Sequence, residues 1–136
     1  MQAIFLIFML FSLSAAAFDI KKGAVPRILF VVYEAVFFAV LFVLNRRMIP
    51  RAATGGIYAL AMFSAVRLLG RKRMGKADIW YALAGAEVLS FFAWHIAMMT
   101  ACCSAALYIA VSGEKKIPFI PFMSLGCISM ILIKKI

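Results

Sequence analysis

The sequence predicts an all-α integral membrane protein, a bundle of about six transmembrane helices. Of its 136 residues, 67% are hydrophobic and 15% are charged, and the mean hydropathy is +1.06. An ordinary globular domain is about half apolar, so this composition excludes a protein of that class. A hydrocarbon core about 30 Å thick needs roughly 20 apolar residues per helix, which leaves room for about five or six spans. Residues 1–136 are therefore expected to form a single membrane-embedded domain.

The 15 lysine and arginine residues lie in short clusters between the apolar runs. With the five acidic residues they give a net charge of +10. They do not form the polar face that nucleic-acid binding would need, and clusters of this kind are typical of topology signals. The three cysteines lie inside apolar segments with no CxxC pair, and the single histidine is not at ligand spacing. The sequence predicts a lipid-embedded chain with no nucleic-acid partner, metal or cofactor.

Polar segments divide the first half of the chain into three spans. We expect the first at residues 2–18 and the second at about 27–44, joined by DIKKGAVP. The third is expected at about 54–70, after NRRMIPR. Each of these runs is apolar over roughly the length that a membrane-crossing helix needs.

The second half of the chain predicts three more helices. Residues 79–111 form one mostly apolar run, about 50 Å long as a helix and too long for one span. We expect it to break near Trp94 and His95, where an interfacial aromatic ring would suit a tight turn. The last span, about 119–133, follows SGEKKIPFIP.

The distribution of basic residues predicts an orientation with the N-terminus outside. Ten basic residues then face the cytoplasm and five face outward, as the positive-inside rule favours. The same orientation puts Asp19, Asp78 and the KKIP segment on the cytoplasmic side. The inner residues are Lys21, Lys22, Arg27, Arg67, Arg71, Lys72, Arg73, Lys76, Lys115 and Lys116, and the outer ones are Arg46, Arg47, Arg51, Lys134 and Lys135.

A secretory signal peptide is the alternative interpretation of the N-terminus. SLSAAAFD has small residues before Phe18, as cleavage sites do. A signal peptide normally begins with a positive region, whereas this chain has no basic residue before Lys21. We therefore expect residues 2–18 to remain as a membrane helix.

The two aspartates, Asp19 and Asp78, are the strongest candidates for chemistry among the five acidic residues. Each lies where a basic segment meets an apolar helix. One interpretation is that they only cap helices. As a pair, however, two carboxyls within a few Å would share a proton, so that one acts as a base on water while the other polarises a carbonyl. That is the chemistry of aspartic proteases.

Three motifs carry a resemblance to the prepilin leader peptidase family, the GxGD-type membrane aspartic peptidases that process type IV pilins and related precursors. DIKKGAVP resembles the first motif, MGKAD the GxGD motif, and KIPFIPFMSLG the third, and they occur in the family's order. The residues that match are Asp19, Lys21, Lys22, Val25 and Pro26, then Gly75 and Asp78, then Lys116, Pro118, Pro121, Phe122 and Gly126.

The resemblance implies a function and its residues. Asp19 and Asp78 would be catalytic, without a metal or cofactor. The substrate would be a prepilin or pseudopilin precursor, cut at the cytoplasmic boundary of a bacterial inner membrane between its basic leader and its apolar helix. The substrate-binding or site-shaping residues would be Lys21, Lys22, Pro26, Gly75, Ala77, Lys116, Pro118 and Pro121. Since the chain begins in a membrane helix, without the family's N-terminal CxxC region, we expect no methyltransferase activity.

Three positions depart from the family pattern. Ala77 replaces the second glycine of GxGD, Trp80 replaces a lysine, and Arg27 replaces an asparagine. If the glycine position requires a positive φ, alanine there would cost about 1 kcal/mol and displace Asp78. A catalytically degenerate member of the family is therefore an alternative.

A small transporter or membrane-assembly subunit is the alternative from another class. Glu34 and Glu87 lie within predicted spans, where ionisable residues are costly and often functional. They are expected to be either proton-carrying sites or partnered structural acids facing the bundle interior. Small residues, including Gly55, Gly56 and Gly85, are expected to permit close helix contacts.

Overall fold

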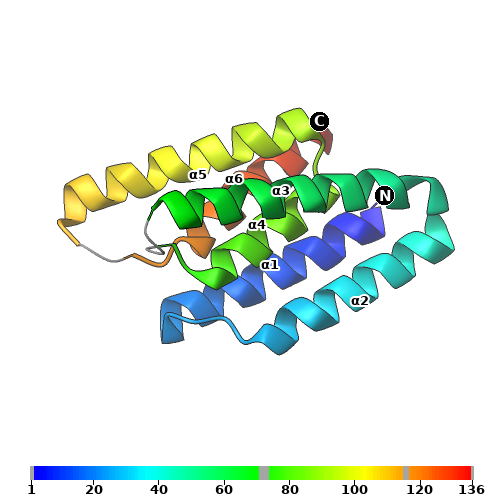
Figure 1. Cartoon of the computed structure of the whole chain (residues 1–136), viewed down its shortest axis with the longest axis horizontal. Coiled ribbons are helices and arrows are strands. Elements are labelled where there is room, and N and C mark those ends of the chain that lie inside the picture. Colours follow the sequence, from blue (N-terminus) through cyan, green and yellow to red (C-terminus); the bar gives the residue numbers. More distant parts are fainter. Residues whose placement is uncertain (1, 71–73, 115–116, 136) are drawn as a thin grey trace.

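The computed structural model describes residues 2–70, 74–114 and 117–135, and it confirms the predicted all-α class. Within these residues there are six α-helices, one short 3-10 helix and no strand. Figure 1 shows that the α-helices run along the long axis of the molecule in alternating directions. They are α1 (Gln2–Lys22), α2 (Arg27–Leu44), α3 (Ile49–Leu69), α4 (Lys76–Val88), α5 (Phe91–Ser112) and α6 (Ile120–Lys135), and η1 (Arg46–Met48) joins α2 to α3.

Four segments of the described chain are long and apolar enough to cross a membrane, namely α1, α2, η1 with α3, and α5. The helix α6 is apolar but shorter. With 13 residues, α4 rises only about 20 Å, less than the thickness of a hydrocarbon core. The chain is therefore a membrane-embedded bundle in which a short helix lies among longer ones.

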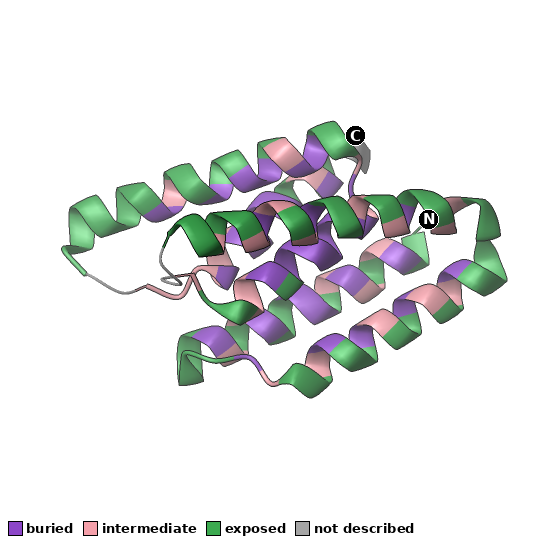
Figure 2. Ribbon diagram, in the orientation of Figure 1, coloured by how far each residue is buried: buried purple, intermediate pink, exposed green. Residues whose placement is uncertain are grey.

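The short helix α4 is the centre of the bundle. It contacts the other five α-helices, and residues 81–87 are buried without interruption. Figure 2 shows the buried residues gathered along α4, whereas exposed residues cover the outer sides of α2, α3 and α5. A helix that is apolar all round and surrounded by others is typical of a buried position.

Polar contacts inside the core fix how α1, α4 and α6 meet. The hydroxyl groups of Ser12 and Tyr81 lie 2.7 Å apart, and Ser124 Oγ donates to the carbonyl oxygen of Ser12 at 3.4 Å. Phe11 stacks between Tyr33 and Tyr81, with ring centroids 4.2 and 5.8 Å away. Because buried hydroxyl groups need partners, these contacts favour one helix register over others.

The boundaries of the first and third helices differ from the predicted ones. The first helix continues through Asp19 to Lys22, because Gly23 adopts a positive φ of 61° and its N–H donates to the carbonyl oxygen of Asp19. The third begins at Ile49, about one turn before the predicted residue 54, with Pro50 in its first turn. Proline is well tolerated there since no intrahelical N–H bond is lost.

The predicted break near Trp94 and His95 is wrong; the helices separate at Leu89 and Ser90. Ser90 starts α5, and its Oγ accepts from the N–H of Ala93 at 3.4 Å. Trp94 is not interfacial but buried, 1% exposed, and its Nε1–H donates to the carbonyl oxygen of Ala82 at 3.0 Å. Its ring therefore fastens α5 to the central helix.

This contact predicts unequal roles for the two tryptophans. Trp94→Phe should lower the free energy of unfolding by about 2 kcal/mol, because it removes a buried hydrogen bond and leaves a small cavity. Trp80 is 45% exposed, and Trp80→Phe should change the free energy by less than about 0.5 kcal/mol. Unfolding followed by circular dichroism in mixed micelles measures both, and equal effects would contradict the assignment.

The expected close contacts of small residues are confirmed between α3 and α4. A Cβ added at Gly55 would lie 2.6 Å from the carbonyl oxygen of Ala86, and one at Gly56 would lie 2.9 Å from Oε1 of Glu87. A Cβ at Gly85 would lie 3.2 Å from Sγ of Cys127 on α6. Glycine at these positions therefore lets both neighbours approach α4 closely.

Candidate active site

A cavity of about 1260 Å³ lies at the end of the bundle where α1 ends and α2 and α4 begin. Figure 1 shows that the start of α6 lies at this same end. The segment before α6 contributes Ile117, Pro118 and Phe119 to the wall. Three acidic and three basic residues line the cavity: Asp19, Glu34 and Asp78, and Arg27, Arg67 and Lys76.

Asp19 reaches the cavity from the last turns of α1 and is 9% exposed. Its Oδ2 accepts a hydrogen bond from the N–H of Ile120 at 3.2 Å. Since the first N–H groups of a helix have no partner inside it, Asp19 caps α6 from another helix. Asp19 therefore makes a capping hydrogen bond, although the helix that it caps is not its own.

Asp78 lies in the first turn of α4, and its Oδ2 accepts from the N–H of Gly75 at 3.0 Å. A carboxylate in this turn also favours the positive end of the helix dipole. Asp78 therefore caps its own helix while it lines the cavity. Both aspartates are held by backbone N–H groups through Oδ2, and no described hydrogen bond engages either Oδ1.

The environment of Asp78 raises the pKa of its carboxyl to about 6. Burial is the largest cause, and the negative charge of Asp19 adds to it. The hydrogen bond from Gly75 acts in the opposite direction. Asp78 therefore titrates close to neutral pH, and the two aspartates are near enough for the charge of one to affect the other.

The structure brings together five of the residues that the sequence selects, and leaves four outside the cavity wall. Asp19, Gly75, Ala77, Asp78 and Pro118 line the cavity. Lys21 and Lys22 are exposed in the last turn of α1, while Pro26 precedes α2 and Pro121 lies in the first turn of α6, both half-buried. Lys116 lies outside the described residues.

The three departures from the family pattern all lie at the cavity. Ala77 is the second residue of α4, in helical conformation, so alanine carries no strain from a positive φ there. Arg27 and Trp80 line the wall. Both residues therefore contribute to the charge and shape of the cavity.

Sequence reasoning missed the contribution of Arg67 to the site. Its Nε donates to the carbonyl oxygen of Met74 at 3.1 Å, which fastens the end of α3 to the segment before Asp78. We counted Arg67 only as a topology signal. The available indication was its position inside an apolar run, one turn before the basic cluster.

These features define an all-α, membrane-embedded bundle with two aspartates in a cavity at one end. The chain matches no protein-family model, no curated protein and no solved structure. An assignment of function therefore depends on the site and on the three sequence motifs.

Proposed function

We propose that this protein is a membrane aspartic endopeptidase of the prepilin leader peptidase type. The observation that carries the proposal is the shared cavity: Asp19 and Asp78 come from different helices, yet both line it. Pro118, from the third motif, lines it too. A pair of carboxyls in one cavity, one of them buried, supports hydrolysis without a metal.

Each carboxyl has a distinct step in the proposed reaction. Asp78, the carboxyl with its pKa raised to about 6, holds the proton and donates a hydrogen bond to the scissile carbonyl oxygen. Ionised Asp19 takes a proton from a water molecule, whose oxygen attacks the carbonyl carbon. The tetrahedral intermediate collapses as the C–N bond breaks, and Asp19 passes the proton that it took from water to the leaving amine, which restores its ionised form.

The proposed substrate is a prepilin or pseudopilin precursor with a basic leader followed by an apolar helix. In a bacterial inner membrane with the cavity facing the cytoplasm, the leader would meet the carboxyls at the aqueous boundary. The apolar helix would stay in lipid beside the cavity wall, where Phe30 and Val31 of α2 supply apolar surface. Water reaches this boundary, whereas deep hydrocarbon would exclude it.

Co-expression with a prepilin from the same genome tests the proposal. The wild-type protein should convert the precursor to a faster-migrating species whose new N-terminus lies at the junction of leader and apolar helix. An unprocessed precursor, with the protein present in the membrane, would favour the degenerate family member instead.

The proposed mechanism predicts a fall in activity as pH rises through about 6. The pKa of Asp78 is raised above its ordinary value, so its proton is retained below about pH 6 and lost above it. Because the acid form polarises the carbonyl, kcat should fall on the alkaline side. Initial rates between pH 5 and pH 8 measure this, and a rate that rises through this range would contradict the assignment of Asp78 as the acid.

A small transporter is the second candidate, because the structure brings Glu34 and Glu87 together inside the bundle. Neutralising substitutions distinguish the two functions. Processing that is lost at Asp19 or Asp78 supports the peptidase. Proton-coupled flux across vesicles that is lost at Glu34 or Glu87 supports the transporter.

A further inference from the structure

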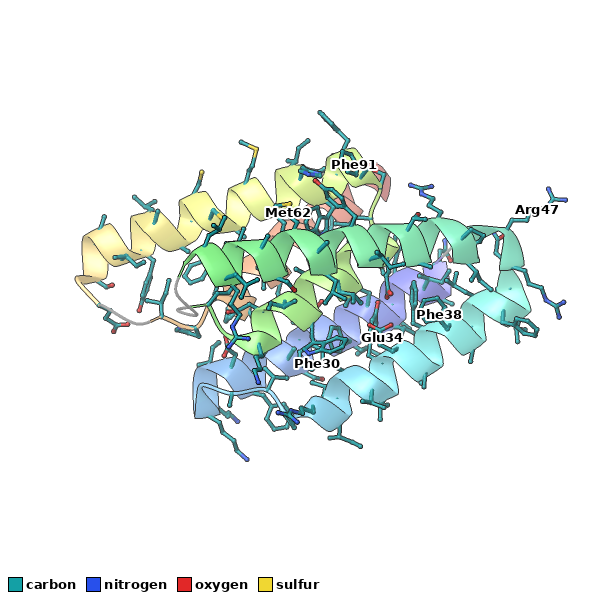
Figure 3. All side chains as sticks on the ribbon, viewed as in Figure 1. Phe30, Glu34, Phe38, Arg47, Met62 and Phe91 are labelled. Atoms are coloured by element: carbon teal, nitrogen blue, oxygen red, sulfur yellow. The ribbon has the colours of Figure 1, made fainter. Side chains whose placement is uncertain are left out.

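A second pair of carboxyls lies deeper in the bundle than the aspartates. Glu34 of α2 lines the inner part of the cavity wall, and Figure 3 shows its side chain pointing into the bundle. Glu87 of α4 is 7% exposed. It follows Asp78 by nine residues, which places it about 13 Å farther along α4. The two glutamate side chains are within reach of a carboxyl–carboxyl hydrogen bond.

The surroundings of Glu87 offer no compensation for a negative charge. Its Oε2 is buried and has no hydrogen-bond partner among the described residues. Its Oε1 and Cγ pack against Gly56, where a Cβ would come within 2.9 and 3.2 Å. The pKa of the Glu87 carboxyl is affected by burial and by Glu34, and by no described lysine or arginine.

Three further titratable groups lie near the pair inside the bundle, and all three are neutral at pH 7. They are the buried Tyr33 of α2, Tyr81 of α4 and Cys127 of α6, whose ordinary ionisation lies above neutral pH. The charged residues that share the cavity with Glu34 are Asp19, Asp78, Arg27, Arg67 and Lys76. None of them is among the influences on either glutamate. Two ionised carboxylates would therefore repel each other with no paired counter-ion, which burial makes unfavourable. A bound positive charge removes this repulsion.

A proton fits this position better than a metal ion. The described residues contain no cluster of three metal-ligating side chains, and Ca²⁺ or Mg²⁺ would need about six oxygen ligands. One proton between two carboxyls needs no further ligand. We propose that Glu34 and Glu87 form a proton-binding site, and that the proton enters it from the cavity through Glu34.

Occupancy of this site would control the contact between two walls of the cavity. Phe30, Val31 and Glu34 of α2 form one wall, and Asp78 and Trp80 of α4 belong to another. A shared proton joins the two helices through a hydrogen bond, whereas its loss puts two like charges between them. This inference does not rest on the proposed peptidase activity.

Infrared spectroscopy of the full chain in lipid vesicles tests the site. The wild type should keep the C=O band of a protonated carboxyl at pH 8, and the Glu34→Gln/Glu87→Gln double variant should lose it. In Glu34→Gln the remaining Glu87 carboxyl should ionise about one pH unit lower or more, because its charged neighbour is gone. Asp19→Asn/Asp78→Asn is the matched control and should keep the band. Absence of the band from the wild type at pH 8, or a Glu34→Gln variant that titrates like the wild type, would overturn the proposal.

Two further measurements test the route by which the proton enters and the pairing of the two carboxyls. Transfer to D₂O should shift the band within the mixing time, because Glu34 lines the cavity; a band that does not shift would contradict entry from the cavity. Gly56→Ala presses on Glu87 and should lower the pH at which the band disappears, since it displaces one carboxyl from the other. An unchanged titration in a folded Gly56→Ala protein would contradict the paired geometry.

Discussion

Replacing Asp19 or Asp78 by asparagine is expected to lower the rate of precursor cleavage by about 10³-fold or more. General acid and base groups each contribute about 10²–10⁴-fold, and a pair that acts as a unit loses most of its effect when one member is removed. Asparagine keeps a side-chain oxygen, so the hydrogen bonds from Ile120 and Gly75 can persist. Initial rates of purified variants in vesicles measure the effect.

Glu114→Gln is the matched control for these substitutions. Glu114 is exposed, follows α5 at the same end of the bundle, and also loses one negative charge on substitution. Its rate should stay within about twofold of the wild type, because it is not part of the cavity wall. A comparable loss in Glu114→Gln would show that net charge rather than the aspartate pair governs cleavage. Full activity in either asparagine variant would show that this aspartate is not required for cleavage.

Gly126→Ala is expected to have the largest effect on folding. Gly126 is buried on α6, and a Cβ there would overlap the carbonyl oxygen of Ala97 on α5. Backbone atoms cannot rotate away as a side chain does, so α5 and α6 must separate. The free energy of unfolding should fall by an amount in the upper part of the roughly 1–3 kcal/mol range for overpacking. Unfolding in mixed micelles by circular dichroism measures it.

Ala106→Val controls for the added volume. Ala106 lies on α5 and is exposed, so its extra methyl groups meet lipid rather than a neighbouring helix. The free energy of unfolding should change by less than about 0.5 kcal/mol. If Gly126→Ala unfolds no more easily than Ala106→Val, α5 and α6 do not approach as closely as this structure has them.

Hydropathy predicted the ends of a span best where charged residues and prolines flank it. The second helix begins at Arg27 and ends at Leu44, as expected, because Pro26 and Arg46 flank a run in which Glu34 is the only charged residue. The run 79–111 has no such boundary, and its break depends on one serine cap at Ser90. The shortness and central position of α4 follow from burial by five neighbours, which local sequence does not encode.

Five of the ten predicted site residues line the cavity, whereas the contacts within it were not predicted. Because the helices alternate in direction, the helix ends that carry Asp19, Asp78 and Pro118 lie at the same end of the bundle. The order of the motifs and the number of spans were enough to predict this placement. The cap on Ile120 and the pairing of Glu34 with Glu87 depend on the rotation of each helix about its axis. Helices that are apolar all round give little indication of that rotation.

Cleavage by the purified protein tests the central claim most directly. The wild-type chain in lipid vesicles is mixed with one prepilin-type precursor in the presence of a metal chelator, and mass spectrometry identifies the products. The account predicts a single cut at the junction of basic leader and apolar helix, absent with Asp19→Asn and with Asp78→Asn. An intact precursor with the wild type, or the same cut with both variants, would contradict it.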